Sequence, residues 1–98
     1  MTDKELLELA AKAAGFSVWT DIDGNLYSGT SGTEVNWNPL TDDGDALRLA
    51  VKLGLWVHCG KCDVSIEGTR IEIPCGNDPY AATRRAIVRA AAQIGETK

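Results

Sequence analysis

Three stretches of this chain place apolar residues at intervals of three and four positions, the spacing of an α-helix with one buried face. The first follows Thr2 and Glu5, which have the spacing of a capping box. The second follows the acidic residues 41–45, and the third begins at Asp78 and Pro79, an N-cap with a proline at the first helical position. A glycine follows each stretch and predicts its end, because glycine accepts a left-handed backbone: Gly15, Gly54 and Gly95.

Each helical stretch predicts a buried face, and alanine is frequent on these faces. The predicted buried residues are Leu6, Leu9, Ala10, Ala13 and Ala14 in the first helix; Leu47, Ala50 and Val51, with Ala46 and Leu53 at the margin, in the second; and Tyr80, Ile87, Ala91 and Ile94, with Val88 at the edge, in the third. Small side chains let such helices lie close to a neighbouring layer.

Strand patterns fill the segments between the helices. Residues 16–20 alternate apolar and polar, Asp23-Gly24 is typical of a tight turn, and residues 26–28 return as a partner strand. Residues 55–59, 61–67 and 69–74 predict three more strands, the last two joined at Gly68. The expected fold is α+β, an antiparallel sheet flanked by helices in the manner of an α/β/α sandwich, in the order α-β-β-α-β-β-β-α.

Length and charge exclude several classes of function. The 98 residues fit a single domain over 1–98. With 10 basic and 14 acidic residues the net charge is −4, so we expect no direct binding to nucleic acid, which needs a cationic surface. No apolar run is long enough to span a membrane and no signal peptide is evident, so we expect a cytoplasmic protein without membrane contact.

The three cysteines allow more than one interpretation. Cys59 and Cys62 have the spacing of a zinc knuckle, and Cys75 with His58 would complete four ligands. However, adjacent residues of a strand point to opposite faces, which separates His58 from Cys59. Free thiols in a reducing cytosol are therefore the favoured interpretation, and no cofactor is expected; zinc and a C-x-x-C redox pair remain as alternatives.

Acidic side chains gather at the start of the second helix. Asp42, Asp43 and Asp45 suit the capping of free amides, although three aspartates in four positions would also suit a magnesium ion. Together with Glu34 they form a surface for a basic partner. The other acidic segment, Asp21-Ile22-Asp23-Gly24-Asn25, starts like a calcium loop but lacks its later ligands, so a turn is favoured.

Two further side-chain types are candidates for binding. Trp37 precedes the second helix, where we expect it to cover the core; an exposed stacking surface for a partner is the alternative. Arg84 falls inside the apolar stripe of the third helix, so its guanidinium pairs internally, with a carboxylate such as Glu72 or with a C-terminal carbonyl, or else binds an anionic ligand together with Arg85.

Two segments carry a family resemblance: WNPLTDDGDALRLA at residues 37–50 and DPYAATRRAIV at residues 78–88. They resemble the small proteins of tailed phages and prophages that carry the phage α/β/α-sandwich domain. The resemblance implies a sheet flanked by helices and brings no catalytic residues, since the activity of this family is undefined. No pattern of that kind is found at residues 17–36 or around the cysteines.

These observations favour a binding protein over an enzyme. The sequence has no nucleophile motif and no phosphate loop, and its single histidine lacks the neighbours of a triad. We expect a non-enzymatic phage protein that binds and inhibits a host protein, such as a nucleic-acid-binding component of antiviral defence, in the infected cell. The first alternative is a protein that sequesters an anionic nucleotide between the protomers of a homo-oligomer. The second is a structural or regulatory phage protein without a ligand.

Overall fold

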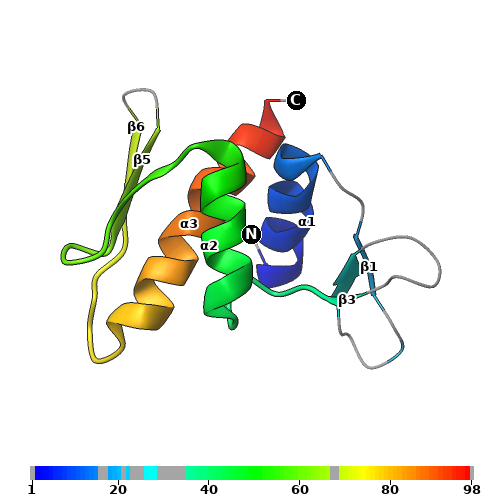
Figure 1. Ribbon diagram of the computed structural model, residues 1–98, viewed down its shortest axis with the longest axis horizontal. Coiled ribbons are helices and arrows are strands. Elements are labelled where there is room, and N and C mark those ends of the chain that lie inside the picture. Colours follow the sequence, from blue (N-terminus) through cyan, green and yellow to red (C-terminus); the bar gives the residue numbers. More distant parts are fainter. Residues whose placement is uncertain are drawn as a thin grey trace.

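Three helices lie side by side in the molecule (Figure 1). They are α1 (Asp3–Ala14), α2 (Asp43–Leu53) and α3 (Pro79–Glu96). The computed structural model describes residues 2–15, 18–20, 22, 26–28, 35–66 and 69–97. The predicted starts of α1 and α3 are confirmed, whereas α2 begins at Asp43, before the predicted start after residue 45. The side chains of Thr2, Asp42 and Asp78 cap the three helices, each accepting a hydrogen bond from the amide three residues later, at 3.2, 2.7 and 3.0 Å.

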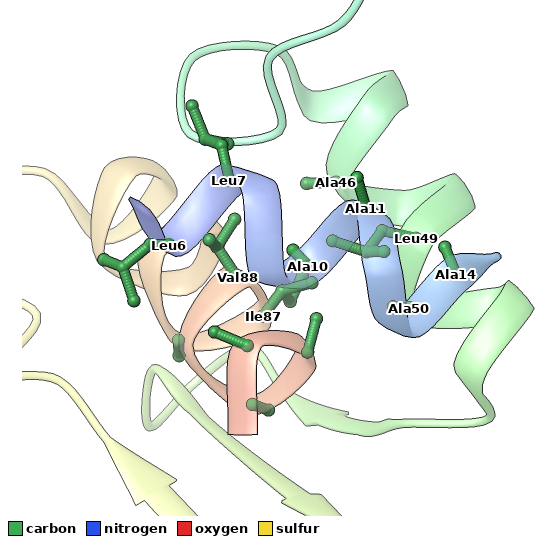
Figure 2. Close-up of a cluster of buried hydrophobic side chains, with 14 of the residues drawn as sticks. Leu6, Leu7, Ala10, Ala11, Ala14, Ala46, Leu49, Ala50, Ile87 and Val88 are labelled. Carbon is green, nitrogen blue, oxygen red and sulfur yellow. The ribbon is translucent and has the colours of Figure 1, made fainter. Parts of the chain in front are cut away.

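The helices enclose a core in which alanine is the most frequent residue. Figure 2 shows side chains of α1, α2 and α3 meeting in this cluster. Its fully or nearly buried members include Leu6, Leu7, Ala10, Ala11, Ala14, Ala46, Leu49, Ala50, Ala86, Ile87, Val88, Ala90, Ala91 and Ala92. The predicted face of α1 is therefore confirmed in outline, except that Leu9 is only partly buried and Leu7 takes an inner position.

Two of the three predicted helix ends are confirmed. Gly15 and Gly54 adopt left-handed backbones, with φ of 84° and 68°, directly after α1 and α2. The prediction for Gly95 is wrong, because α3 continues to Glu96. A Cβ atom at position 95 would lie 2.0 Å from the carbonyl oxygen of Leu9, so this glycine lets the backbones of α3 and α1 approach each other.

The strands form two separate antiparallel sheets at opposite ends of the helical layer (Figure 1). One contains β1 (Val18–Thr20), β2 (Leu26–Ser28) and β3 (Val35–Asn36), and the other contains β4 (Trp56–His58), β5 (Asp63–Ile66) and β6 (Thr69–Glu72). The α+β class and the predicted element order are thus confirmed, with β3 as an additional short strand. The turn predicted at Asp23-Gly24 and the residue Gly68 lie outside the described residues.

The β4–β6 sheet packs one face against α3. Val57, Val64 and Ile71 lie opposite one another in the register, and Val64 is fully buried under the helix. The second face carries Trp56, which is 71% exposed, and the exposed Arg70. In the described part of the chain, helices therefore cover one side of this sheet.

The buried faces of α2 and of the start of α3 differ from the prediction. Ala46, Leu49 and Ala50 face the core in α2, whereas Leu47 and Val51 are 63% and 73% exposed. Positions 47 and 51 are each two residues from Leu49, which places them about 160° from it around the helix axis, so burying Leu49 leaves both away from the core. Tyr80, predicted to be buried, lies in the first turn of α3 beyond the core and is 70% exposed.

None of the described helices is both long and apolar enough to cross a membrane.

Candidate functional site

An apolar groove lies between α2, α3 and β4. Leu47 and Tyr80 form its two walls, and Ala46, Val57 and Ile87 line its floor, around a volume of about 450 Å³. The walls come from the two helices and the floor comes partly from the sheet, so the packing of α2, α3 and β4 creates the groove. Large exposed apolar side chains around a hollow are typical of a surface that binds a partner.

The acidic cluster at the start of α2 borders this groove. Asp42 caps the helix, and Asp45 accepts hydrogen bonds from the amide of Asn38 at 3.0 Å and from Arg48 at 2.8 Å. The capping interpretation of the cluster is therefore confirmed. The side chain of Asp45 is only 13% exposed, whereas those of Asp42 and Asp43 are 58% and 70% exposed. Of the three, Asp42 and Asp43 are the ones open to a partner.

Arg84 pairs internally, as one of the two interpretations predicted. Its Nε donates to the carbonyl oxygen of Leu40 at 2.9 Å, and its Nη1 donates to Asp43 Oδ1 at 2.6 Å. The prediction of Glu72 as its carboxylate partner is wrong. Arg84 forms its ion pair with Asp43 instead, because α2 and α3 start near the same end of the molecule (Figure 1). The acidic surface and the arginine, which the sequence suggested as separate sites, are thus joined in one ion pair.

Arg85 connects α3 to the other neighbouring helix. Its Nη2 donates to Asp3 Oδ1 of α1 at 3.0 Å, and its side chain is 40% exposed. The two arginines proposed to bind an anion therefore point to opposite neighbours, Arg84 to α2 and Arg85 to α1. Both guanidinium groups already have a carboxylate partner.

Trp37 is buried, with 6% of its surface exposed, among the residues of the hydrophobic core. This agrees with a tryptophan that covers the core and makes Trp37 a poor candidate for the partner contact that its position suggested. Glu34 and the calcium-like residues Asp21, Asp23 and Asn25 lie outside the described residues.

The prediction of three free thiols is wrong for two of the cysteines. Cys62 and Cys75 form a disulfide with their Cα atoms 5.7 Å apart, and Cys59 is free and exposed. The amide of Ile73 donates to the carbonyl oxygen of Cys62 at 3.3 Å, which brings the segment after β6 beside the β4–β5 turn. A zinc site of three thiolates is incompatible with this bond, and so is a redox pair between Cys59 and Cys62 in this form of the protein.

A second polar cluster was not predicted. Asp63 is 1% exposed and accepts from Arg70 Nε at 2.9 Å and from its Nη2 at 2.5 Å, and His58 Nε2 lies 4.0 Å from Asp63 Oδ1. The hydrogen bond with Asp63, helped by the charges of Asp63 and Glu72, raises the pKa of Arg70 above its usual value. In the register, His58, Asp63 and Glu72 lie opposite one another, and Arg70 shares their face because it is two residues from Glu72. The two-residue alternation of the strands was the available signal in the sequence.

No group of three or more metal-ligating side chains converges in the ranges that the structure describes. The zinc candidate His58 faces Asp63, whereas the zinc candidate Cys59 lines the groove on the other side of β4.

No family model, no curated protein and no solved structure matches this chain.

Proposed function

We propose that this chain is a non-enzymatic phage protein that binds and inhibits a host protein, for which a component of antiviral defence is our candidate. The observation that carries the proposal is the apolar groove with Leu47 and Tyr80 exposed on its walls. Leucine and tyrosine side chains remain in water here, and covering them with a partner would gain free energy from apolar burial.

The groove is also where the family resemblance is concentrated. The segments at residues 37–50 and 78–88 supply all of its lining residues except Val57 and Cys59. This overlap links the phage-protein part of the proposal to the groove.

The charge of the surface indicates a basic partner. Asp42, Asp43 and Asp78 are exposed at the starts of α2 and α3. Arg84 pairs with Asp43 and Arg48 lies 3.9 Å from Asp42, and the chain as a whole still carries a net charge of −4. A partner segment with apolar side chains and flanking lysines or arginines fits both the groove and its rim. The positively charged nucleic-acid channel of a defence protein has this chemistry.

The test compares two apolar-to-polar changes on exposed residues. Leu47→Ser alters the groove wall, and Ile22→Ser alters a fully exposed apolar residue outside the groove lining. The host protein captured by the wild-type chain is identified, purified and titrated against each variant by calorimetry. We expect Leu47→Ser to weaken the affinity at least tenfold and Ile22→Ser to leave it unchanged; equal affinities for all three proteins would refute the groove as the binding surface.

A functional assay checks the inhibition. Expression of the wild-type chain is expected to raise the plating efficiency of a defence-sensitive phage, and Leu47→Ser is expected to remove this effect. Protection retained by Leu47→Ser and lost in Ile22→Ser would contradict the proposal.

A further inference from the structure

The second face of the β4–β6 sheet contains a buried carboxylate oxygen that is not hydrogen-bonded. Asp63 is 1% exposed, and both contacts from Arg70 go to its Oδ2. Oδ1 has no hydrogen-bond partner among the residues that the structure describes, and His58 Nε2, at 4.0 Å, is too distant to donate. A buried acceptor in this condition costs free energy, so a ligand that supplies an N–H donor would be stabilised here.

The charges around Asp63 favour a cation as that ligand. Arg70 Nε lies 2.9 Å from Asp63 Oδ2 and 3.1 Å from Glu72 Oε1, so two carboxylates share one guanidinium. Asp63, Glu72 and Arg70 together carry a net charge of −1. A single positive charge balances the cluster, whereas an anion such as phosphate would meet two carboxylates.

An exposed aromatic ring stands on the same face. Trp56 precedes His58 by two residues on β4, lies opposite Ser65 in the register, and is 71% exposed. A hollow of about 670 Å³ lies over this face, and Trp56, His58, Ser65 and Arg70 are among its lining residues. The face of an indole attracts ammonium and guanidinium groups, and this attraction strengthens beside carboxylates that hold the cation.

We propose that this face binds an organic cation of the ammonium or guanidinium type, with Asp63 Oδ1 accepting one of its N–H groups and the Trp56 ring in cation–π contact with the charged group. His58, which is half-exposed, lines the hollow and its Nε2 lies 4.0 Å from Asp63 Oδ1, whereas the buried Asp63 does not line it, so binding through Oδ1 requires the imidazole to turn away. The site is separate from the groove between α2 and α3, so it does not depend on the function proposed for that groove. The cation is either a free polyamine or a lysine or arginine side chain of a bound protein.

The experiment is an NMR titration of the full chain at pH 8 and constant ionic strength. Methylammonium, tetramethylammonium, spermidine and a lysine peptide with blocked termini are added separately, and the indole signals are followed. We expect saturable shifts of the Trp56 signal, with Trp19 and Trp37 as internal references. Methylammonium is expected to bind more tightly than tetramethylammonium, which has no N–H group to donate to Asp63.

Variants test the individual contacts. Trp56→Ala is expected to weaken binding about tenfold, as removal of a cation–π contact would, and Glu72→Gln is expected to weaken it while preserving the Asp63–Arg70 pair. Glu8→Gln, an exposed change on α1, is the control and is expected to bind as the wild type does. Asp63→Asn is less informative because it also removes the partner of Arg70.

The remaining outcomes support or overturn the proposed cation site, or identify the source of the cation. Equal shifts with sodium chloride, or equal affinity for methylammonium and tetramethylammonium, would overturn the site. His58→Ala is expected to bind the cation as tightly as the wild type or more tightly, because it leaves Oδ1 more accessible. Binding of zinc by the wild type that is lost in His58→Ala would show a metal site and refute the proposal. Tighter binding of the lysine peptide than of spermidine identifies a protein side chain as the source of the cation, and the reverse identifies a free polyamine.

Discussion

The two flanks of α3 are held in different ways. Towards α1, its surface consists largely of alanines, and Gly95 brings the two backbones into contact at Leu9. Towards α2 and β4, the helices leave a groove with Leu47 and Tyr80 on its walls. This open flank is held at its end by the Arg84–Asp43 ion pair and by a disulfide that lies close to the start of α3.

The comparison shows how residue size separates structure from binding. Small side chains allow helices to approach until no surface between them remains for a partner. Large side chains such as Leu47 and Tyr80 that point outwards are not packed between the elements, and their apolar surface stays in water. Substitutions on the flank of α3 that faces α1 (the closed flank) are therefore expected to lower the stability of the protein. Substitutions on the flank that faces α2 and β4 (the open flank) are expected to weaken the binding of a partner.

The largest effect is expected at the closed flank, in the Gly95→Ala variant. The added Cβ would stand 2.0 Å from the carbonyl oxygen of Leu9, and a backbone atom cannot rotate away as a side chain does. The helices must separate, and we expect the free energy of unfolding to fall by about 3 kcal/mol or more, at or above the upper end for overpacking. Urea denaturation followed by circular dichroism measures this loss.

Gly60→Ala is the matched control for this variant. A Cβ at position 60 meets no atom within 4 Å, and its backbone does not require glycine. We expect a change within about 0.5 kcal/mol. Similar stability losses in both variants would show that the α1–α3 contact is not the tight one.

The same contact shows where sequence patterns succeed and where they fail. The caps at Thr2, Asp42 and Asp78 were predictable because each depends on a side chain and an amide three residues away. The role of Gly95 was not, because the reason for glycine there is the backbone of Leu9, which is distant in the sequence. The position of Gly95 near a helix end predicts a helix terminator. The reason for glycine there is instead the close approach of α3 to the backbone of α1 at Leu9.

The second prediction concerns the disulfide at the open flank. Reduction of Cys62–Cys75 is expected to lower the free energy of unfolding by about 2–3 kcal/mol, as the loop-entropy model gives for a separation of 13 residues. Denaturation with and without a phosphine reductant measures the difference. Cys59→Ser should lose as much stability on reduction as the wild type, because Cys59 lies outside the bond.

A thiol count checks the pairing itself. The unreduced chain is expected to react with one equivalent of an alkylating reagent, at Cys59. Three reactive thiols in the protein purified without reductant would contradict the disulfide and restore the free-thiol interpretation.

The third prediction compares the two arginines on opposite flanks of α3. Arg84 is 17% exposed and donates to a carbonyl and a carboxylate, so Arg84→Ala is expected to cost about 1–2 kcal/mol. Arg85 is 40% exposed and contacts only Asp3 among the described residues, so Arg85→Ala is expected to cost about 0.5 kcal/mol or less. Thermal denaturation in low and high salt measures both, and an equal loss would show that the burial of Arg84 adds nothing.

The candidate site was predictable in its residues but not in their arrangement. Asp43 and Arg84 were both selected from the sequence, yet their pairing depends on how α2 and α3 lie against each other. Leu47 was assigned to the buried face because helical spacing allows two adjacent apolar stripes in α2, and periodicity alone cannot decide which one faces the core. The burial of Leu49 decided it, through packing against distant residues.

The smallest effect on stability is expected for Tyr80→Ala, on the wall of the groove. Because Tyr80 is 70% exposed, its removal uncovers little buried surface, and we expect the free energy of unfolding to change by no more than about 0.5 kcal/mol. Leu47→Ala should behave alike, and the double variant should be additive within about 0.5 kcal/mol if the two walls do not support each other. A loss above 1 kcal/mol for Tyr80→Ala would mean that the ring is buried in solution, as the helical stripe predicted. The open flank would then be part of the core, and the distinction between a closed and an open side of α3 would fail.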